Sequence, residues 1–134
     1  MCGIFGYIGK EKACQFILDG LQKLDYRGYD SSGIATLDSS FHVVKQVGCI
    51  DNLCNAIKQG NEVDELVGNV GIGHVRWATH GIISERNAHP HLSCNGRIAV
   101  VHNGIVRNDV SLKRDLLERG HVLISDTDSE LIAI

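Results

Sequence analysis

The sequence lacks the features that mark membrane, secreted and nucleic-acid-binding proteins. No apolar run approaches the roughly 18 residues that a membrane-spanning helix needs. The N-terminus has no basic segment followed by an apolar stretch, so no secretory signal is predicted. The net charge is only −3, which gives no electrostatic footprint for nucleic acid or an anionic membrane. We therefore expect neither a nucleic-acid nor a membrane partner.

The cysteine pattern lacks any pairing motif. The count is odd, the spacings are irregular and no Cys-x-x-Cys occurs among Cys2, Cys14, Cys49, Cys54 and Cys94. This pattern argues against a disulfide framework and against a zinc ribbon. A reducing, cytoplasmic location is the natural expectation.

Motifs for common cofactors are also missing. The glycine-containing stretch at residues 26–33 lacks the Gly-Lys-Ser/Thr ending of a phosphate-binding loop, and no His-Glu-x-x-His occurs. Seven histidines keep a metal site open as an alternative, although His89 and His91 fall in a loop with the single proline. No cofactor is predicted.

What remains is an ordinary globular composition, with 43% apolar and 22% charged residues in a 14.6 kDa chain. Alternating or continuous apolar patterns predict strands at 3–8, 70–76, 97–102 and 121–124, and a hairpin of 33–37 with 41–47. Helical spacing predicts helices at 12–24, 50–58 and 112–119. Residues 127–130 have the form of a capping box that opens a further helix. The pattern indicates one α+β domain.

The first two residues are the most informative position in the chain. If Met1 is removed, Cys2 carries both a thiol and a free α-amine, whose ordinary pKa values are nearly matched. The amine then serves as the base for the thiol, as in N-terminal nucleophiles. The alternative is a Cys2 that simply fills a core position, as free cysteines often do.

Three further clusters at the ends of predicted strands suggest a site for an amino acid. Asn103 and Gly104 offer an amide and a backbone N–H for an oxyanion, although Asn-Gly after an apolar strand is also the strongest short signal for a hairpin turn. Arg76 could hold a carboxylate through two hydrogen bonds, or merely pair on the surface. Asp128 could bind an ammonium group, or merely favour a helix N-terminus.

The ordered motifs resemble the glutaminase domain of the class II, N-terminal-nucleophile glutamine amidotransferases. The motifs are Met-Cys-Gly-Ile at 1–4, Tyr-Arg-Gly-Tyr-Asp-Ser-Ser-Gly at 26–33, Gly-His-Val-Arg-Trp-Ala-Thr-His-Gly at 73–81, Asn-Ala-His-Pro-His at 87–91, His-Asn-Gly-Ile at 102–105 and Ser-Asp-Thr-Asp-Ser-Glu at 125–130. The resemblance spans essentially the whole chain. It implies a four-layer αββα sandwich.

The resemblance also implies a role for each matching residue. The nucleophile is Cys2, the oxyanion hole is Asn103 and Gly104, and the glutamine-binding residues are Arg76, Trp77, Thr79, His80 and Asp128. Cys2 would form a glutamyl thioester and release ammonia and then glutamate. A glutamine-binding fragment without turnover is the alternative reading.

The 26–33 motif is most similar to members that aminate fructose 6-phosphate and form amino sugars. In these, ammonia passes to a sugar-isomerase region, and the full-length proteins are expected to be homo-oligomers. Residues 1–134 (2–134 without Met1) are expected to cover the first half to two-thirds of the glutaminase domain, without the isomerase region.

Overall fold

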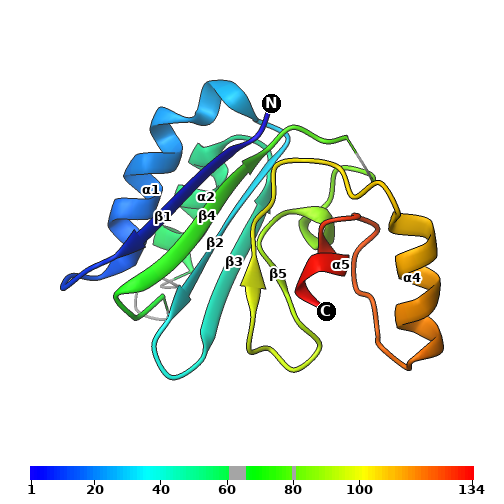
Figure 1. The fold of residues 1–134 in the computed structure, drawn as a ribbon. Coiled ribbons are helices and arrows are strands. Elements are labelled where there is room, and N and C mark those ends of the chain that lie inside the picture. Colours follow the sequence, from blue (N-terminus) through cyan, green and yellow to red (C-terminus); the bar gives the residue numbers. More distant parts are fainter. Residues whose placement is uncertain (61–65, 80) are drawn as a thin grey trace.

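The computed structural model of the chain describes residues 1–60, 66–79 and 81–134. Strands and helices are interspersed along it (Figure 1). The described strands are β1 (Gly3–Ile8), β2 (Ser31–Leu37), β3 (Phe41–Val47), β4 (Val70–Arg76), β5 (His91–Leu92) and β6 (Ala99–Val100). The described helices are α1 (Ala13–Lys23), α2 (Ile50–Gln59), α4 (Asp109–Glu118) and α5 (Glu130–Ala133), with short 3-10 turns η1 (Asp25–Arg27) and η2 (Glu85–Asn87).

The main sheet is antiparallel, with the strand order β1-β4-β2-β3. Gly3 of β1 and Ser32 of β2 both pair with Val75 of β4. Because neighbouring strands run in opposite directions, the beginnings of β1 and β2 lie beside the end of β4. This register places three predicted motifs at the same end of the sheet's strands: Cys2, the 26–33 segment and the segment after Arg76.

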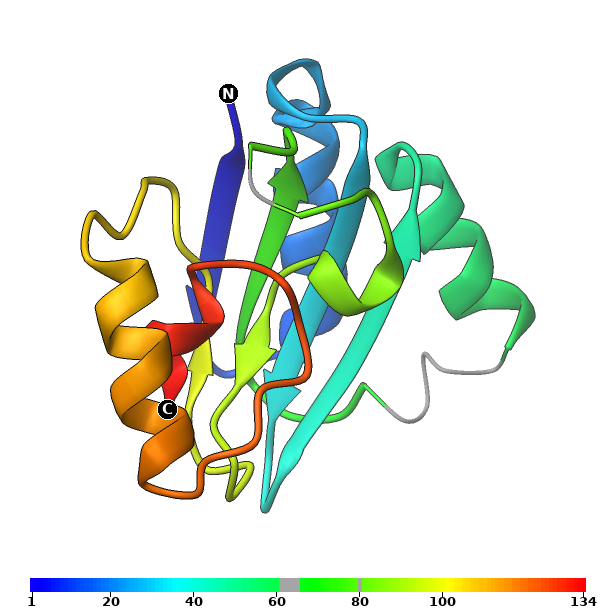
Figure 2. The same ribbon diagram turned by 90° about the vertical axis from the view of Figure 1, so that its right-hand side faces the viewer.

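The elements stack in four layers. Helices α1 and α2 cover one face of the main sheet, while the two-stranded β5-β6 sheet and helices α4 and α5 lie on the other (Figures 1 and 2). Strand β2 is buried from Ser31 to Thr36 because both of its faces are covered. The prediction of an α+β, αββα architecture is confirmed. No helix in the described ranges is long and apolar enough to cross a membrane.

The principal core lies between the main sheet and helices α1 and α2. Ile17 and Leu21 of α1 are fully buried and recur at helical spacing, as the sequence predicts. They rest on β4 where the strand carries glycines: a Cβ on Gly71 would lie 2.6 Å from Ile17 Cδ1, and one on Gly73 would lie 2.8 Å from Leu21 Cδ1. The missing side chains let the helix approach the sheet closely.

The second sheet is smaller than the sequence predicts. A strand is expected over 97–102, but only Ala99 and Val100 pair, with His91 and Leu92. The partner strand is short because it follows Pro90 and ends at Leu92; the next residue, Ser93, begins a turn in which its Oγ accepts the Ile98 N–H (3.0 Å). The β-pairing that apolar residues favour therefore ends after two residues.

The predicted strand at 121–124 and the predicted capping box are both wrong. Residues 121–124 have no ladder, and Glu130 instead accepts the Ile124 N–H and the Ser125 N–H, both at 2.7 Å. Thr127 does not cap the helix, since its hydroxyl bonds to His91 Nε2 (2.9 Å). Helix α5 begins after Ser129 without a side-chain cap. The carboxylate thus organises the preceding loop rather than a helix end.

Candidate active site

The thiol of Cys2 lies against the chain that leaves β4. Trp77 donates its backbone N–H to Cys2 Sγ at 3.1 Å, and the thiol lies 3.4 Å from the Trp77 carbonyl oxygen. Both contacts follow from the β1–β4 register, which sets Cys2 beside the residues that follow Val75. The nucleophile predicted from the sequence is therefore partly exposed at a sheet edge, and it does not fill a core position.

Asn103 is held in one orientation beside Cys2. Its Nδ2 donates to the Cys2 carbonyl oxygen at 3.1 Å, and its Oδ1 lies 2.9 Å from His74 Nε2. Because the amide oxygen can only accept, His74 donates from Nε2. Burial lowers the pKa of His74 to about 4, so the ring is neutral near pH 7 and carries its proton on that nitrogen. The amide N–H groups therefore face the cysteine.

A row of buried histidines supports this arrangement. The rings of His74 and His89 stack at 4.1 Å between centroids, and His91 meets His89 edge-on at 4.6 Å. His89 Nδ1 accepts the backbone N–H of His102 (3.3 Å), the residue before Asn103. Burial lowers the pKa of His91 to about 3, and it lowers that of His89 further. The histidines considered as metal ligands thus pack as neutral rings, and the described ranges hold no group of three side chains placed to bind a metal.

Two opposite charges are buried on the segments that face each other across the site. Arg76 ends β4 and is 3% exposed, and burial lowers the pKa of its guanidinium while Cys2, Asp30 and Asp128 favour its charged form. Asp128 is 6% exposed, and its Oδ2 accepts the Val106 N–H at 2.7 Å. A buried cation and a buried anion that face one cavity match the two charges of an α-amino acid.

A cavity of about 330 Å³ brings these groups together. It is lined by seven of the residues predicted from the sequence: Cys2, Arg76, Trp77, Thr79, Asn103, Gly104 and Asp128. His80, also predicted, lies outside the described residues. The volume is at the small end of the range of about 300–1,000 Å³ for small-molecule sites, which suits a single amino acid.

The aromatic side chain at the cavity is partly exposed. Trp77 is 45% exposed and meets the ring of Tyr29 edge-on at 5.5 Å. The next residue, Ala78, donates its N–H to Asp30 Oδ2 at 2.7 Å, so the segment after β4 is anchored to the 26–33 motif. That motif therefore shapes the wall of the cavity.

Sequence reasoning missed several residues of the lining. Arg27 donates from Nε to the Cys2 carbonyl oxygen at 3.2 Å, and His89, His102 and Ser129 also face the cavity. Each of these residues lies inside one of the ordered motifs, and this is the sign in the sequence that they belong to the site. Nothing in their spacing assigned these side chains to the cavity, because the contacts join residues far apart in the chain.

Comparisons with known proteins agree with this geometry. A family model described as the glutamine amidotransferase domain matches residues 58–134. The chain is 58% identical over 134 residues to glutamine–fructose-6-phosphate aminotransferase (isomerizing) of Pyrococcus horikoshii and 52% identical to that of Thermococcus kodakarensis. In both cases the match covers 99% of this chain and 22% of the relative, so the chain spans about a fifth of their length.

Solved structures show the same fold. Glutamine phosphoribosylpyrophosphate amidotransferase from B. subtilis, solved with ADP and GMP, superposes with a TM-score of 0.79 at 31% identity, over 99% of this chain and 28% of that chain. A structure described as the allosteric regulatory enzyme of purine biosynthesis gives a TM-score of 0.82, also at 31% identity, with the same two coverages. The chain therefore belongs to the glutamine amidotransferase domain family.

Proposed function

We propose that residues 1–134 form part of a glutaminase domain in which Cys2 attacks the side-chain amide of glutamine. What supports the proposal is one cavity that joins the Cys2 thiol, the Asn103 amide and the two opposite charges of Arg76 and Asp128. Arg76 would bind the α-carboxylate and Asp128 the α-ammonium, with Trp77, Thr79 and His80 completing the pocket. The substrate amide would then lie beside the sulfur.

The chemistry requires that Met1 be removed. The α-amine of Cys2 then takes the thiol proton, and Sγ attacks the amide carbon. Asn103 Nδ2 and the Gly104 N–H stabilise the oxyanion that forms. The proton passes to the departing nitrogen, ammonia leaves and a thioester remains. A water that the α-amine deprotonates attacks the thioester, which releases glutamate and restores the thiol.

For the whole protein we propose that the ammonia aminates fructose 6-phosphate. The relatives from Pyrococcus horikoshii and Thermococcus kodakarensis carry that activity in their names, and the 26–33 motif has the form expected for it. We also propose a cytoplasmic location, which suits the free thiols of all five cysteines, and a homo-oligomeric full-length protein.

The direct test is release of glutamate and ammonia from glutamine by the protein without Met1. Cys2→Ala is expected to abolish release, whereas Cys94→Ala, at an exposed cysteine outside the cavity, should leave it unchanged. Saturable glutamine binding without turnover would replace the proposal by the binding-only alternative. Release that survives Cys2→Ala would refute it.

A further inference from the structure

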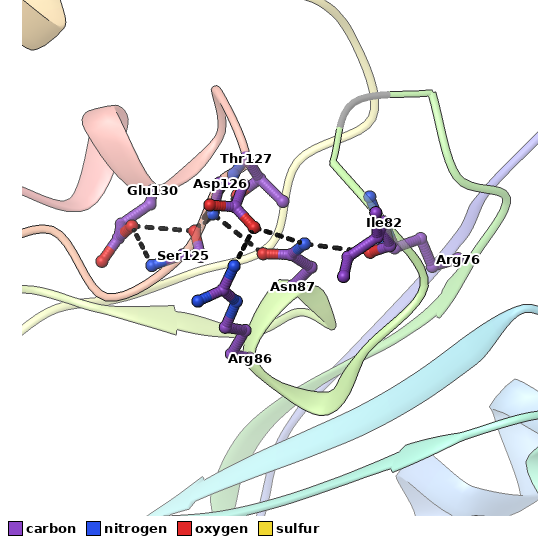
Figure 3. A network of polar contacts seen from close by, with 8 residues as sticks. All are labelled: Arg76, Ile82, Arg86, Asn87, Ser125, Asp126, Thr127 and Glu130. Atoms are coloured by element: carbon purple, nitrogen blue, oxygen red, sulfur yellow. Dashed lines mark hydrogen bonds and ion pairs between the residues drawn. The ribbon is translucent and has the colours of Figure 1, made fainter.

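One buried side chain joins the two loops that carry the charges of the cavity. Asn87 ends the short turn η2 and is fully buried. Its Nδ2 donates to the carbonyl oxygen of Ile82 (2.9 Å) and to Asp126 Oδ2 (3.2 Å), and its Oδ1 accepts the Asp126 N–H (2.8 Å). Figure 3 shows this amide between the loop after β4 and the loop before α5. Both ends of the side-chain amide are therefore engaged, since Nδ2 donates to each loop and Oδ1 accepts from the loop before α5.

On one side the contacts lead to Arg76. The carbonyl oxygen of Ile82 that Asn87 holds also accepts from Arg76 Nη1 at 3.4 Å (Figure 3). Gly81 lies directly against the amide: its φ is +75°, and a Cβ there would be 2.8 Å from Asn87 Nδ2. The loop therefore fits closely onto Asn87, and the Ile82 carbonyl is fixed where it meets the guanidinium.

On the other side the contacts lead to Asp128, two residues beyond Asp126. The far end of this loop is anchored by Glu130, whose carboxylate accepts the Ser125 N–H (2.7 Å) and hydroxyl (2.8 Å). Arg86 also pairs with Asp126, but both side chains are about half exposed, and exposed ion pairs contribute little. The buried amide of Asn87 is thus the principal link between the two loops.

We propose that Asn87 is a positioning residue that sets the separation of Arg76 and Asp128, and thereby the affinity for the amino-acid end of the substrate. The inference rests on the proposed function, because it assumes that these two charges bind glutamine. Asn87 does not touch the Cys2 thiol in this arrangement. Its loss should weaken substrate binding and leave the chemistry at sulfur unchanged.

The test compares two reagents for Cys2 in the protein without Met1. The glutamine analogue 6-diazo-5-oxo-L-norleucine has an amino-acid end that needs the charges of both Arg76 and Asp128 for binding. In its reaction the diazo carbon gains a proton from solvent, the Cys2 thiolate displaces N₂, and a thioether forms. Iodoacetamide has neither charge and loses iodide to the same thiolate. Labelling of Cys2 is followed by mass spectrometry of the N-terminal peptide. Asn87→Ala should raise the half-saturating analogue concentration about tenfold or more, because the Ile82 carbonyl and the Asp126 N–H both lose the amide that holds the two loops together.

The maximal labelling rate and the iodoacetamide rate should change less than about twofold, since neither depends on the two charges. The matched control is Asn52→Ala. That amide also donates to a backbone carbonyl, Val47 (3.0 Å), beside a glycine of positive φ, but away from the cavity. Asn52→Ala should leave the half-saturating analogue concentration, the maximal labelling rate and the iodoacetamide rate unchanged.

Rescue provides a second readout. Asn87→Asp sets a carboxylate against Asp126 and should weaken analogue binding more than Asn87→Ala does. Adding Asp126→Asn restores a donor–acceptor pair between the loops and should recover part of the loss. An unchanged half-saturating concentration in Asn87→Ala, or an equal fall in both reagent rates, would overturn the positioning role. A parent protein that reacts with iodoacetamide but not with the analogue would refute the proposed function, and this inference with it.

Discussion

We expect the protein to lose stability when the pH is lowered from 7.5 to 5.5, because the fold keeps three histidines neutral. Burial lowers the pKa of His74 to about 4 and of His91 to about 3, and that of His89 falls in the same direction. In the unfolded chain each ring regains an ordinary pKa of about 6.5. The unfolded state therefore binds more protons across this range, and stability falls as the pH falls.

The magnitude follows from the number of protons. Each histidine that stays neutral in the folded state but titrates at about 6.5 when unfolded costs about 1.4 kcal/mol at pH 5.5. Three such rings cost about 4 kcal/mol together, which is a large part of a typical stability of about 5–15 kcal/mol. Acidic side chains add little at pH 5.5, because carboxyl groups titrate mostly below about pH 5.

The assay is urea unfolding at several pH values between 7.5 and 5.5. His91→Gln keeps a polar partner for Thr127. Because it removes one of the three titrating rings, it should reduce the pH dependence of the unfolding free energy by about a third. As a control, Asn52→Gln changes no titratable group, and the pH dependence should stay as in the parent. A stability that is constant between pH 7.5 and 5.5 would refute the reasoning that these rings are held neutral by burial.

Three substitutions probe the site itself. Asn103→Ala should lower the rate constant of glutamine hydrolysis by about 10²–10³, measured as glutamate release, because an oxyanion donor is lost; an unchanged rate constant would exclude that role. Asp128→Asn should raise KM for glutamine about tenfold or more, with little effect on kcat, because the ammonium loses its charged partner; equal changes in both would contradict a binding role. Gly28→Ala should lower the unfolding free energy by about 1–3 kcal/mol in urea titrations, since the new Cβ would lie 2.6 Å from the Arg76 carbonyl carbon; a neutral result would show that the backbone shifts freely.

The main sheet and its helices could be predicted because each element repeats its pattern over several residues. Residues 3–8 and 70–76 form β1 and β4 with the predicted bounds, and helices α1 and α2 differ from their predicted ranges by at most one residue at either end. The predictions failed where the length of a strand is set by the partner strand with which it pairs. Residues 97–102 are as apolar as a strand, but they form only the short β6 because β5 offers two residues to pair with.

The composition of the site could be predicted only in part, for a related reason. Cys2, Arg76 and Asp128 carry chemistry that a motif can reveal, and the β1–β4 register brings the first two together. The contacts of His74 with Asn103 and of Asn87 with Asp126 join residues 29 and 39 positions apart, and the ordinary local context of His74 and Asn87 gives no sign of them. Such supporting side chains become visible only when the fold places the loops side by side.

The most direct test of the central claim is the intact mass of the purified protein before and after the diazoketone analogue, with and without excess glutamine. We expect a chain that has lost Met1, takes one adduct on Cys2 and is protected by glutamine. A chain that keeps Met1, is labelled elsewhere, or reacts equally with and without glutamine would contradict the assignment of Cys2 as an N-terminal nucleophile in a glutamine site.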